Sequence, residues 1–172
     1  MLLFYDQLVR PAADGKSLEP GLATDWKASA DGLTYTFHLR DAKFHDGTTV
    51  TSEDVAYCVD RAAKLQGSGW TFIFSAIDKI ESTDPKTVVF HLKTPWAPFE
   101  ADLALFAASI FPKAAHVAQG DKLFDKPIGS GPYVFDSWDK GNQIVLKKNP
   151  NYWEPGKPYL DQLTFKVLQD SN

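Results

Sequence analysis

Cysteine is nearly absent from this sequence, since Cys58 is its single representative. One cysteine excludes an internal disulfide and any zinc site built from several thiolates. Apolar runs are also short: the longest uncharged one covers residues 103–112, well below the ~20 residues of a membrane-spanning helix. Lysine and arginine form no cluster and the net charge is −4, so a nucleic-acid partner is not expected.

The first residues also lack the features of a secretory signal peptide. Met1 is followed by apolar residues and then Asp6, with neither a basic segment nor a small-residue cleavage site. The rest of the composition, 44% hydrophobic and 23% charged, is that of an ordinary soluble globular protein. The 172 residues suffice for one domain with a hydrophobic core and are few for two.

Alternating apolar and polar residues predict several strands. The clearest is 33–40, which follows the Asp31-Gly32 turn and places Tyr35 and Phe37 on one face. Residues 9–20 are predicted to form a loop with a turn near Gly15. Further strands are predicted at 77–81, 87–93, 133–138, 143–148 and 160–168.

Helices are predicted between these strands. Thr51 is placed to cap a helix, with the carboxylate of Asp54 reaching back to it. A second helix is predicted from Pro98 to Phe106, and a third over 113–119, closed by Gly120. About six strands and two or three helices predict an α+β fold with a mixed, mainly antiparallel sheet and inserted helices.

Motifs for catalysis and for metal or cofactor binding are missing. Gly129-Ser130-Gly131 lacks the spacing of a nucleophile elbow, so a tight turn with close backbone approach is favoured over a nucleophilic serine. None of the four histidines pairs with another at metal-ligand spacing. No catalytic residue, metal ligand or cofactor is therefore predicted, and Cys58 is expected to be a buried apolar residue.

An aromatic run over residues 69–74 is the main binding candidate. Rings beside a glycine-rich break suit stacking on a ligand, although the same rings could pack in the core. Trp70 is the first candidate for ligand binding, and Phe72 and Phe74 rank below it. Spacing alone thus indicates a binding module without catalysis.

Seven short motifs follow one another along the chain: YDQLV, PGLATDW, DGLTYTFHLR, KFHDG followed by TSEDV, TVVFHL, PIGSGPY and NPNYW. In this order they resemble the large extracellular solute-binding proteins of bacterial ABC transporters, family 5, which include peptide- and nickel-binding proteins. They extend over nearly the whole chain.

The resemblance implies the fold and the role. Members have two lobes of the type II periplasmic binding protein fold that close on a solute. Residues 1–172 would form a single partial domain, the N-terminal part of lobe 1, with the second lobe and the C-terminal return outside this sequence. The implied function is to capture a peptide or similar small organic solute and deliver it to an ABC permease. The parent protein would be periplasmic, or lipid-anchored at the cell surface.

The resemblance also implies ligand-binding residues. Trp70 corresponds to a tryptophan that lines the cleft in nickel-binding relatives, and a second lining stretch covers 106–110, with Phe106, Ala107 and Ser109. Nickel-binding relatives carry an arginine in that stretch, which this sequence lacks. A peptide or other organic solute is therefore favoured, with a nickel or metal chelate and an oligosaccharide as alternatives in the same fold.

Two other functions remain open from the sequence. A hydrolase would use Ser130 or His45, without a recognisable paired base. Alternatively, the chain binds nothing strongly by itself, because one wall of a cleft offers only part of the contacts. In that case surfaces that are normally covered would favour self-association.

Overall fold

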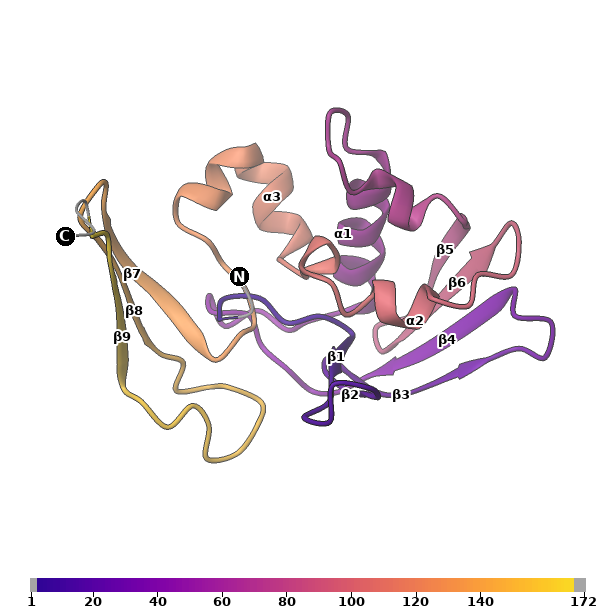
Figure 1. The fold of residues 1–172 in the computed structure, drawn as a ribbon, viewed down its shortest axis with the longest axis horizontal. Helices are drawn as coiled ribbons and strands as arrows, with labels where there is room; N and C mark the ends of the chain where they lie inside the picture. The colour runs from indigo at the N-terminus through magenta and orange to yellow at the C-terminus, as the bar shows by residue number, and fades with distance from the viewer. Residues whose placement is uncertain (1–2, 169–172) are drawn as a thin grey trace.

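Residues 3–168 are described by the computed structural model, and they form three antiparallel sheets with helices between them. The first sheet pairs β1 (Val9–Pro11) with β2 (Leu18–Pro20). The second has the order β3 (Ala23–Ala28), β4 (Thr34–Leu39), β6 (Thr87–Leu92), β5 (Ile77–Asp84). The third consists of β7 (Tyr133–Asp139), β8 (Gln143–Lys148) and β9 (Gln162–Lys166). Figure 1 shows the second and third sheets at opposite sides of the molecule, with the helices above and between them.

The predicted strand at 33–40 is confirmed as β4, a central strand between β3 and β6. Tyr35, Phe37 and Leu39 are buried, whereas His38 is exposed. Phe37 stands edge-on to Phe90 of β6, with ring centroids 5.6 Å apart. The period-two pattern therefore marks the strand that carries the centre of the core.

Helix α1 (Ser52–Lys64) begins where the capping pattern predicts. One carboxylate oxygen of Asp54 accepts hydrogen bonds from the Thr51 amide at 3.0 Å and from the Thr51 hydroxyl at 2.7 Å. The other oxygen accepts from the Lys113 amide at 2.9 Å, which fixes the start of α3 (Lys113–Gln119) against α1. Cys58 is buried on α1, as expected.

Three strands were not predicted, or were predicted wrongly. The loop expected over 9–20 contains the hairpin β1–β2, whose turn is held by Asp14 accepting from the Lys16 and Ser17 amides. Each strand has three residues and ends in proline, so no alternation can be read from it. In β3 only Ala23 is buried, because this strand pairs with β4 alone at the edge of its sheet.

The second predicted helix is also corrected, because it does not continue from Pro98 to Phe106. Helix α2 covers Phe99–Asp102, and a separate 3₁₀ turn, η2, covers Phe106–Ala108. Leu105 between them is extended, with φ −75° and ψ 153°, which breaks the helical hydrogen bonding. Phe99 and Leu103 stay fully buried, whereas Phe106 is 40% exposed.

The expected close backbone approach at the glycine-rich turn is confirmed. The Gly131 amide donates to the Phe4 carbonyl at 2.9 Å, and a Cβ at Gly129 would overlap that same carbonyl oxygen. His45 fastens the turn from the other side: its Nε2 donates to the Gly131 carbonyl at 3.0 Å and its Nδ1 accepts from the Gly129 amide at 3.2 Å. The third sheet is thereby joined to the N-terminal segment.

Candidate functional site

An open groove of about 480 Å³ lies beside α1. Its walls come from the N-terminal segment, one face of α1, the loop before the 3₁₀ turn η1 (Thr71–Phe74), η2, and the 3₁₀ segment η3 (Gly120–Asp125). We call it the aromatic groove; it is lined by Tyr5, Cys58, Arg61, Ala62, Leu65, Ser68, Trp70, Phe106, Ala107, Ser109, Phe111, Asp121 and Phe124. Four of the five predicted ligand-binding residues are among them.

Trp70 and Phe106 form an aromatic pair in this groove. Their ring centroids are 4.6 Å apart at an interplanar angle of 78°, and their exposed fractions are 41% and 40%. The edge-to-face arrangement fixes both rings while part of each remains open to solvent. Because η2 is separate from α2, Phe106 faces this groove and not the core side occupied by Phe99.

Ser109 fixes the backbone at the end of η2. Its hydroxyl donates to the Phe106 carbonyl at 2.7 Å and accepts from the Gln7 side-chain amide at 3.1 Å. The adjacent Ile110 amide donates to the Asp6 carbonyl at 3.1 Å. The N-terminal segment therefore holds Phe106 and Ala107 in place along the groove.

The predicted aromatic run divides three ways. Trp70 lines the groove, whereas Phe74 is 1% exposed and belongs to the core. Phe72 is 68% exposed on η1 and lies outside the groove lining. The ligand-binding role predicted for Phe72 thus remains a prediction that the groove geometry does not include.

Sequence reasoning did not single out a charged pair in the groove. The Nη2 of Arg61 lies 2.8 Å from an Asp121 carboxylate oxygen, and the Arg61 guanidinium carbon is 5.5 Å from the centre of the Phe124 ring. The Asp121 carboxyl has a pKa below its ordinary value because His116 and Arg61 interact with it. The sequence does carry a signal for Arg61, because this residue shares one helical face with Cys58, Ala62 and Leu65.

Ser130 and His45, the candidates for a hydrolase, do not form a catalytic pair. Ser130 is 1% exposed, and its hydroxyl donates to an Asp6 carboxylate oxygen at 3.1 Å. Both ring nitrogens of His45 are engaged with the glycine-rich backbone, and burial lowers the pKa of that imidazole. Within residues 3–168, no group of three or more histidine, cysteine, aspartate or glutamate side chains is placed to hold a metal ion.

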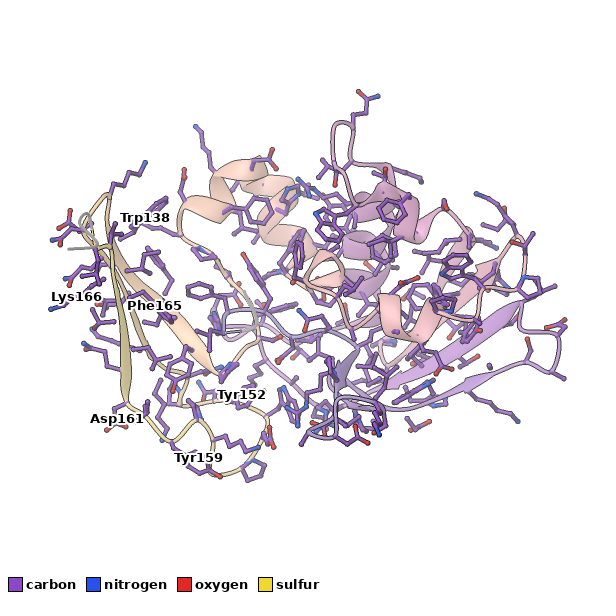
Figure 2. The ribbon with its side chains drawn as sticks, viewed as in Figure 1. Trp138, Tyr152, Tyr159, Asp161, Phe165 and Lys166 are labelled. Carbon is purple, nitrogen blue, oxygen red and sulfur yellow. The ribbon has the colours of Figure 1, made fainter. Side chains whose placement is uncertain are left out.

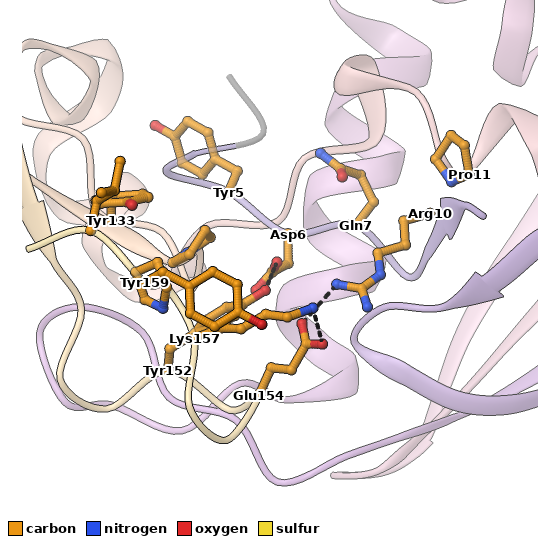
Figure 3. Close-up of a pocket in the computed structure, with 13 residues that line it drawn as sticks. Tyr5, Asp6, Gln7, Arg10, Pro11, Tyr133, Tyr152, Glu154, Lys157 and Tyr159 are labelled. Atoms are coloured by element: carbon orange, nitrogen blue, oxygen red, sulfur yellow. Dashed lines mark hydrogen bonds and ion pairs between the residues drawn. The ribbon is translucent and has the colours of Figure 1, made fainter. Parts of the chain in front are cut away.

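A second cavity, of about 470 Å³, lies next to Asp6 and is shown in Figure 3. Glu154 there accepts from Arg10 at 3.1 Å and from Lys157 at 2.7 Å. The charged side chains of this cavity therefore neutralise one another, which makes it a weaker candidate than the groove for binding a solute.

The Asp6 carboxylate is fully engaged by the motif near the end of the chain. It accepts hydrogen bonds from the Trp153 indole at 3.0 Å and the Tyr152 hydroxyl at 3.3 Å, besides the one from Ser130. The Arg40 guanidinium carbon lies 3.7 Å from the centre of the Trp153 ring. Burial raises the pKa of Asp6 to about 6. This network joins distant parts of the chain.

The family model for bacterial extracellular solute-binding proteins, family 5, matches residues 17–172. The chain belongs to this family. Among curated relatives, it is 40% identical to the probable D,D-dipeptide-binding periplasmic protein DdpA of Escherichia coli, over 97% of this chain and 34% of that protein. It is 37% identical to the di/tripeptide-binding protein 2 of Pseudomonas aeruginosa, over 98% of this chain and 36% of that protein.

Solved structures of periplasmic binding proteins superpose closely on the fold. The binding protein AgaA from A. tumefacien, in complex with agropinic acid, matches with a TM-score of 0.92 at 39% identity, over 98% of this chain and 34% of that one. DppA from Helicobacter pylori, in complex with a peptide, matches with a TM-score of 0.86 at 33% identity, over 98% of this chain and 37% of that one. The α+β fold is that of periplasmic binding proteins.

The chain spans about a third of the length of the curated relatives that it matches. Both relatives are named as binding proteins for small peptides, and DdpA is named as periplasmic, in keeping with the predicted family. Within residues 3–168, none of the helices combines the length and apolar character needed to cross a membrane.

Proposed function

We propose that residues 1–172 are part of the first lobe of a solute receptor for an ABC importer, and that the aromatic groove is one wall of its binding cleft. The observation that carries this proposal is that predicted ligand-binding residues far apart in the sequence line the same groove. Trp70, Phe106, Ala107 and Ser109 come from two separate segments, yet they line one groove. Mostly apolar walls with a few polar groups are typical of small-molecule sites.

The proposed solute is a peptide or a similar small organic molecule. Relatives are named for a D,D-dipeptide, for di- and tripeptides and for glutathione, which supports this class. A metal chelate is the second candidate, because NikZ from Campylobacter jejuni in complex with Ni(L-His) has the same fold, with a TM-score of 0.83 at 28% identity. The aromatic walls of the groove favour the organic solute.

The receptor is proposed to act by binding alone, without catalysis, cofactor or nucleic acid. Its lobes would close around the solute and present it to the permease. The parent protein would work in the periplasm or be lipid-anchored at the cell surface. The engagement of Ser130 with the Asp6 carboxylate and of His45 with the glycine-rich backbone supports the absence of a catalytic role.

Replacing Trp70 tests the assignment of the groove. In an NMR titration with the tripeptide Ala-Phe-Ala, we expect binding by the 172-residue chain to be millimolar, because one wall supplies part of the contacts. Trp70→Ala should weaken it by about fivefold or more, since an aromatic contact is lost.

The matched control is Trp138→Ala. Trp138 is a similarly exposed tryptophan at 49%, on β7 of the third sheet, and its loss should leave binding unchanged. Phe72→Ala decides whether that ring joins the site from outside the groove. An equal effect of the two tryptophan variants would contradict the proposed site.

A further inference from the structure

We infer that Arg61 is a specificity-determining residue that selects solutes carrying a carboxylate next to an apolar side chain. This inference rests on the proposed function of the aromatic groove and deepens it. The residue that would select the class of solute lies on α1, outside the aromatic run and outside the stretch 106–110.

Arg61 occupies a position at which an apolar side chain is expected. Cys58, Arg61, Ala62 and Leu65 follow one another at helical spacing and all line the groove. The other three are small or apolar, and placing a guanidinium among them costs desolvation. Within the described part of the chain, Arg61 is the one cationic side chain in the groove lining.

The Arg61 guanidinium has donors to spare. A guanidinium carries five N–H groups, and among residues 3–168 its single acceptor is Asp121, reached from Nη2. The Phe124 ring, 5.5 Å from the guanidinium carbon, fixes the orientation of the plane. The remaining N–H groups suit the planar, two-point recognition of a second carboxylate.

Asp121 is a weakly held partner of Arg61, and a solute carboxylate could bind the guanidinium beside Asp121 or in its place. Its side chain is 78% exposed, against 23% for Arg61, and an exposed ion pair is held by little free energy. The Nε2 of His116 also lies 3.4 Å from an Asp121 carboxylate oxygen, so Asp121 has a second hydrogen-bond partner besides Arg61. The groove therefore offers a fixed cation with open donors and no comparable fixed anion.

The rest of the groove determines what accompanies the carboxylate. Trp70 and Phe106 present partly exposed rings, which suit an apolar or aromatic side chain of the solute. Because the whole chain has a net charge of −4, its overall field repels anions. A preference for an acid over its amide would thus have to arise from a local cation.

A matched pair of probes tests the inference: Ala-Phe with a free carboxylate and the same dipeptide as its C-terminal amide. NMR titration of the 172-residue chain should show the acid binding about fivefold more tightly than the amide, as expected for one partly exposed ion pair. In Arg61→Gln the two probes should bind equally. Lys27→Gln, which makes the same change of charge at an exposed site on β3, should keep the preference.

Asp121→Asn separates recognition from folding. This variant breaks the Arg61–Asp121 ion pair while leaving the arginine, so it should keep or increase the preference for the acid. The role of Arg61 would be overturned if the preference for the acid were lost in Asp121→Asn, or if it persisted in Arg61→Gln. Equal binding of both probes to the unsubstituted chain would overturn the inference and leave the groove as a binding site. If neither probe shifts groove resonances, the proposed function fails as well.

Discussion

Asp6 has a larger structural role than its place in a short N-terminal motif indicates. Three side chains from two later motifs donate to its carboxylate, and burial raises the pKa of that carboxyl. The sequence shows the motif but not this convergence, because nothing local to Asp6 specifies partners from the other end of the chain. A buried carboxylate with three donors indicates a position at which pH acts on stability.

Stability should therefore depend on the ionisation of Asp6. Its pKa rises from the ordinary value of 3.8 to about 6 in the folded chain, chiefly through burial. Stabilisation by the neutral carboxyl is thus complete below the unfolded pKa and is lost as the pH rises through about 6. Between pH 4 and pH 7, the free energy of unfolding should fall by about 2 kcal/mol relative to that of Asp6→Asn.

Urea unfolding of both chains at several pH values measures this difference. His45, whose lowered pKa acts in the opposite direction, is present in both chains and cancels in the comparison. A difference between the two chains that stays constant with pH would contradict the assignment.

Gly129 is a second residue whose role depends on a distant neighbour. Any Cβ there meets the backbone of Phe4, which cannot move without losing its bond to Gly131. Gly129→Ala should lower the free energy of unfolding by about 3 kcal/mol. Gly69→Ala is the control, because a Cβ at Gly69 meets nothing within 4 Å; thermal melts in which the two variants match would refute this account.

Helices and strands were predicted correctly where their sequence pattern depends on neighbouring residues, and they were missed where they depend on tertiary contacts. The capping residues of α1 and the alternation of β4 depend on neighbours in sequence, and both were found. The strands β1 and β2 have three residues each, and β3 exposes four of its six residues, so none of them carries a readable alternation of buried and exposed positions. The split of the helix after Pro98 was missed because Leu105 adopts its extended conformation in a segment whose residues are otherwise compatible with a helix.

The capping residues of α1 support a quantitative prediction. Thr51→Ala should cost about 1 kcal/mol of unfolding free energy, the usual loss for an N-cap. Asp54→Ala should cost about 2 kcal/mol, because its carboxylate also holds the Lys113 amide of α3. Glu53→Ala is the neighbouring control: its ion pair with Lys113 is exposed, so a change below about 0.5 kcal/mol is expected. Denaturant titration gives all three values, and equal costs for Glu53 and Asp54 would contradict the tie to α3.

For the whole molecule, the third sheet presents an apolar face that is only partly covered. Trp138, Ile144 and Phe165 lie side by side across β7, β8 and β9, and Figure 2 labels Trp138 and Phe165 on this sheet. Trp138 and Phe165 are 49% and 50% exposed. The next row inward, which contains the buried Leu146, joins the body of the molecule through Phe135 and Phe4.

This face should make the isolated chain self-associate at high concentration. Sedimentation velocity over a concentration series should show a rising average mass, and Phe165→Ser should weaken the association about tenfold, as expected for losing part of a buried phenyl ring. Tyr159→Ser is the control, because Tyr159 is 82% exposed but lies in the loop before β9. A chain that stays monomeric at all concentrations would contradict the prediction.

The candidate site illustrates the same division between local and tertiary information. The resemblance implies Trp70 and the stretch 106–110 as ligand-binding, and Trp70, Phe106, Ala107 and Ser109 line one groove. Arg61 and Asp121 come from α1 and η3, and their meeting depends on how those elements pack. Phe72 looks equivalent to Trp70 in the sequence, yet the turn of η1 directs it elsewhere.

The long separation in sequence between Asp6 and its hydrogen-bond donors has a consequence for when these bonds form during synthesis. Its three donors lie 124, 146 and 147 positions further along the chain. At a synthesis rate of about 5–20 residues per second, the N-terminal segment waits several seconds before any of these partners leaves the ribosome. The hydrogen bonds of Asp6 therefore form only after these later residues have been made, and each of them closes a long loop of the chain.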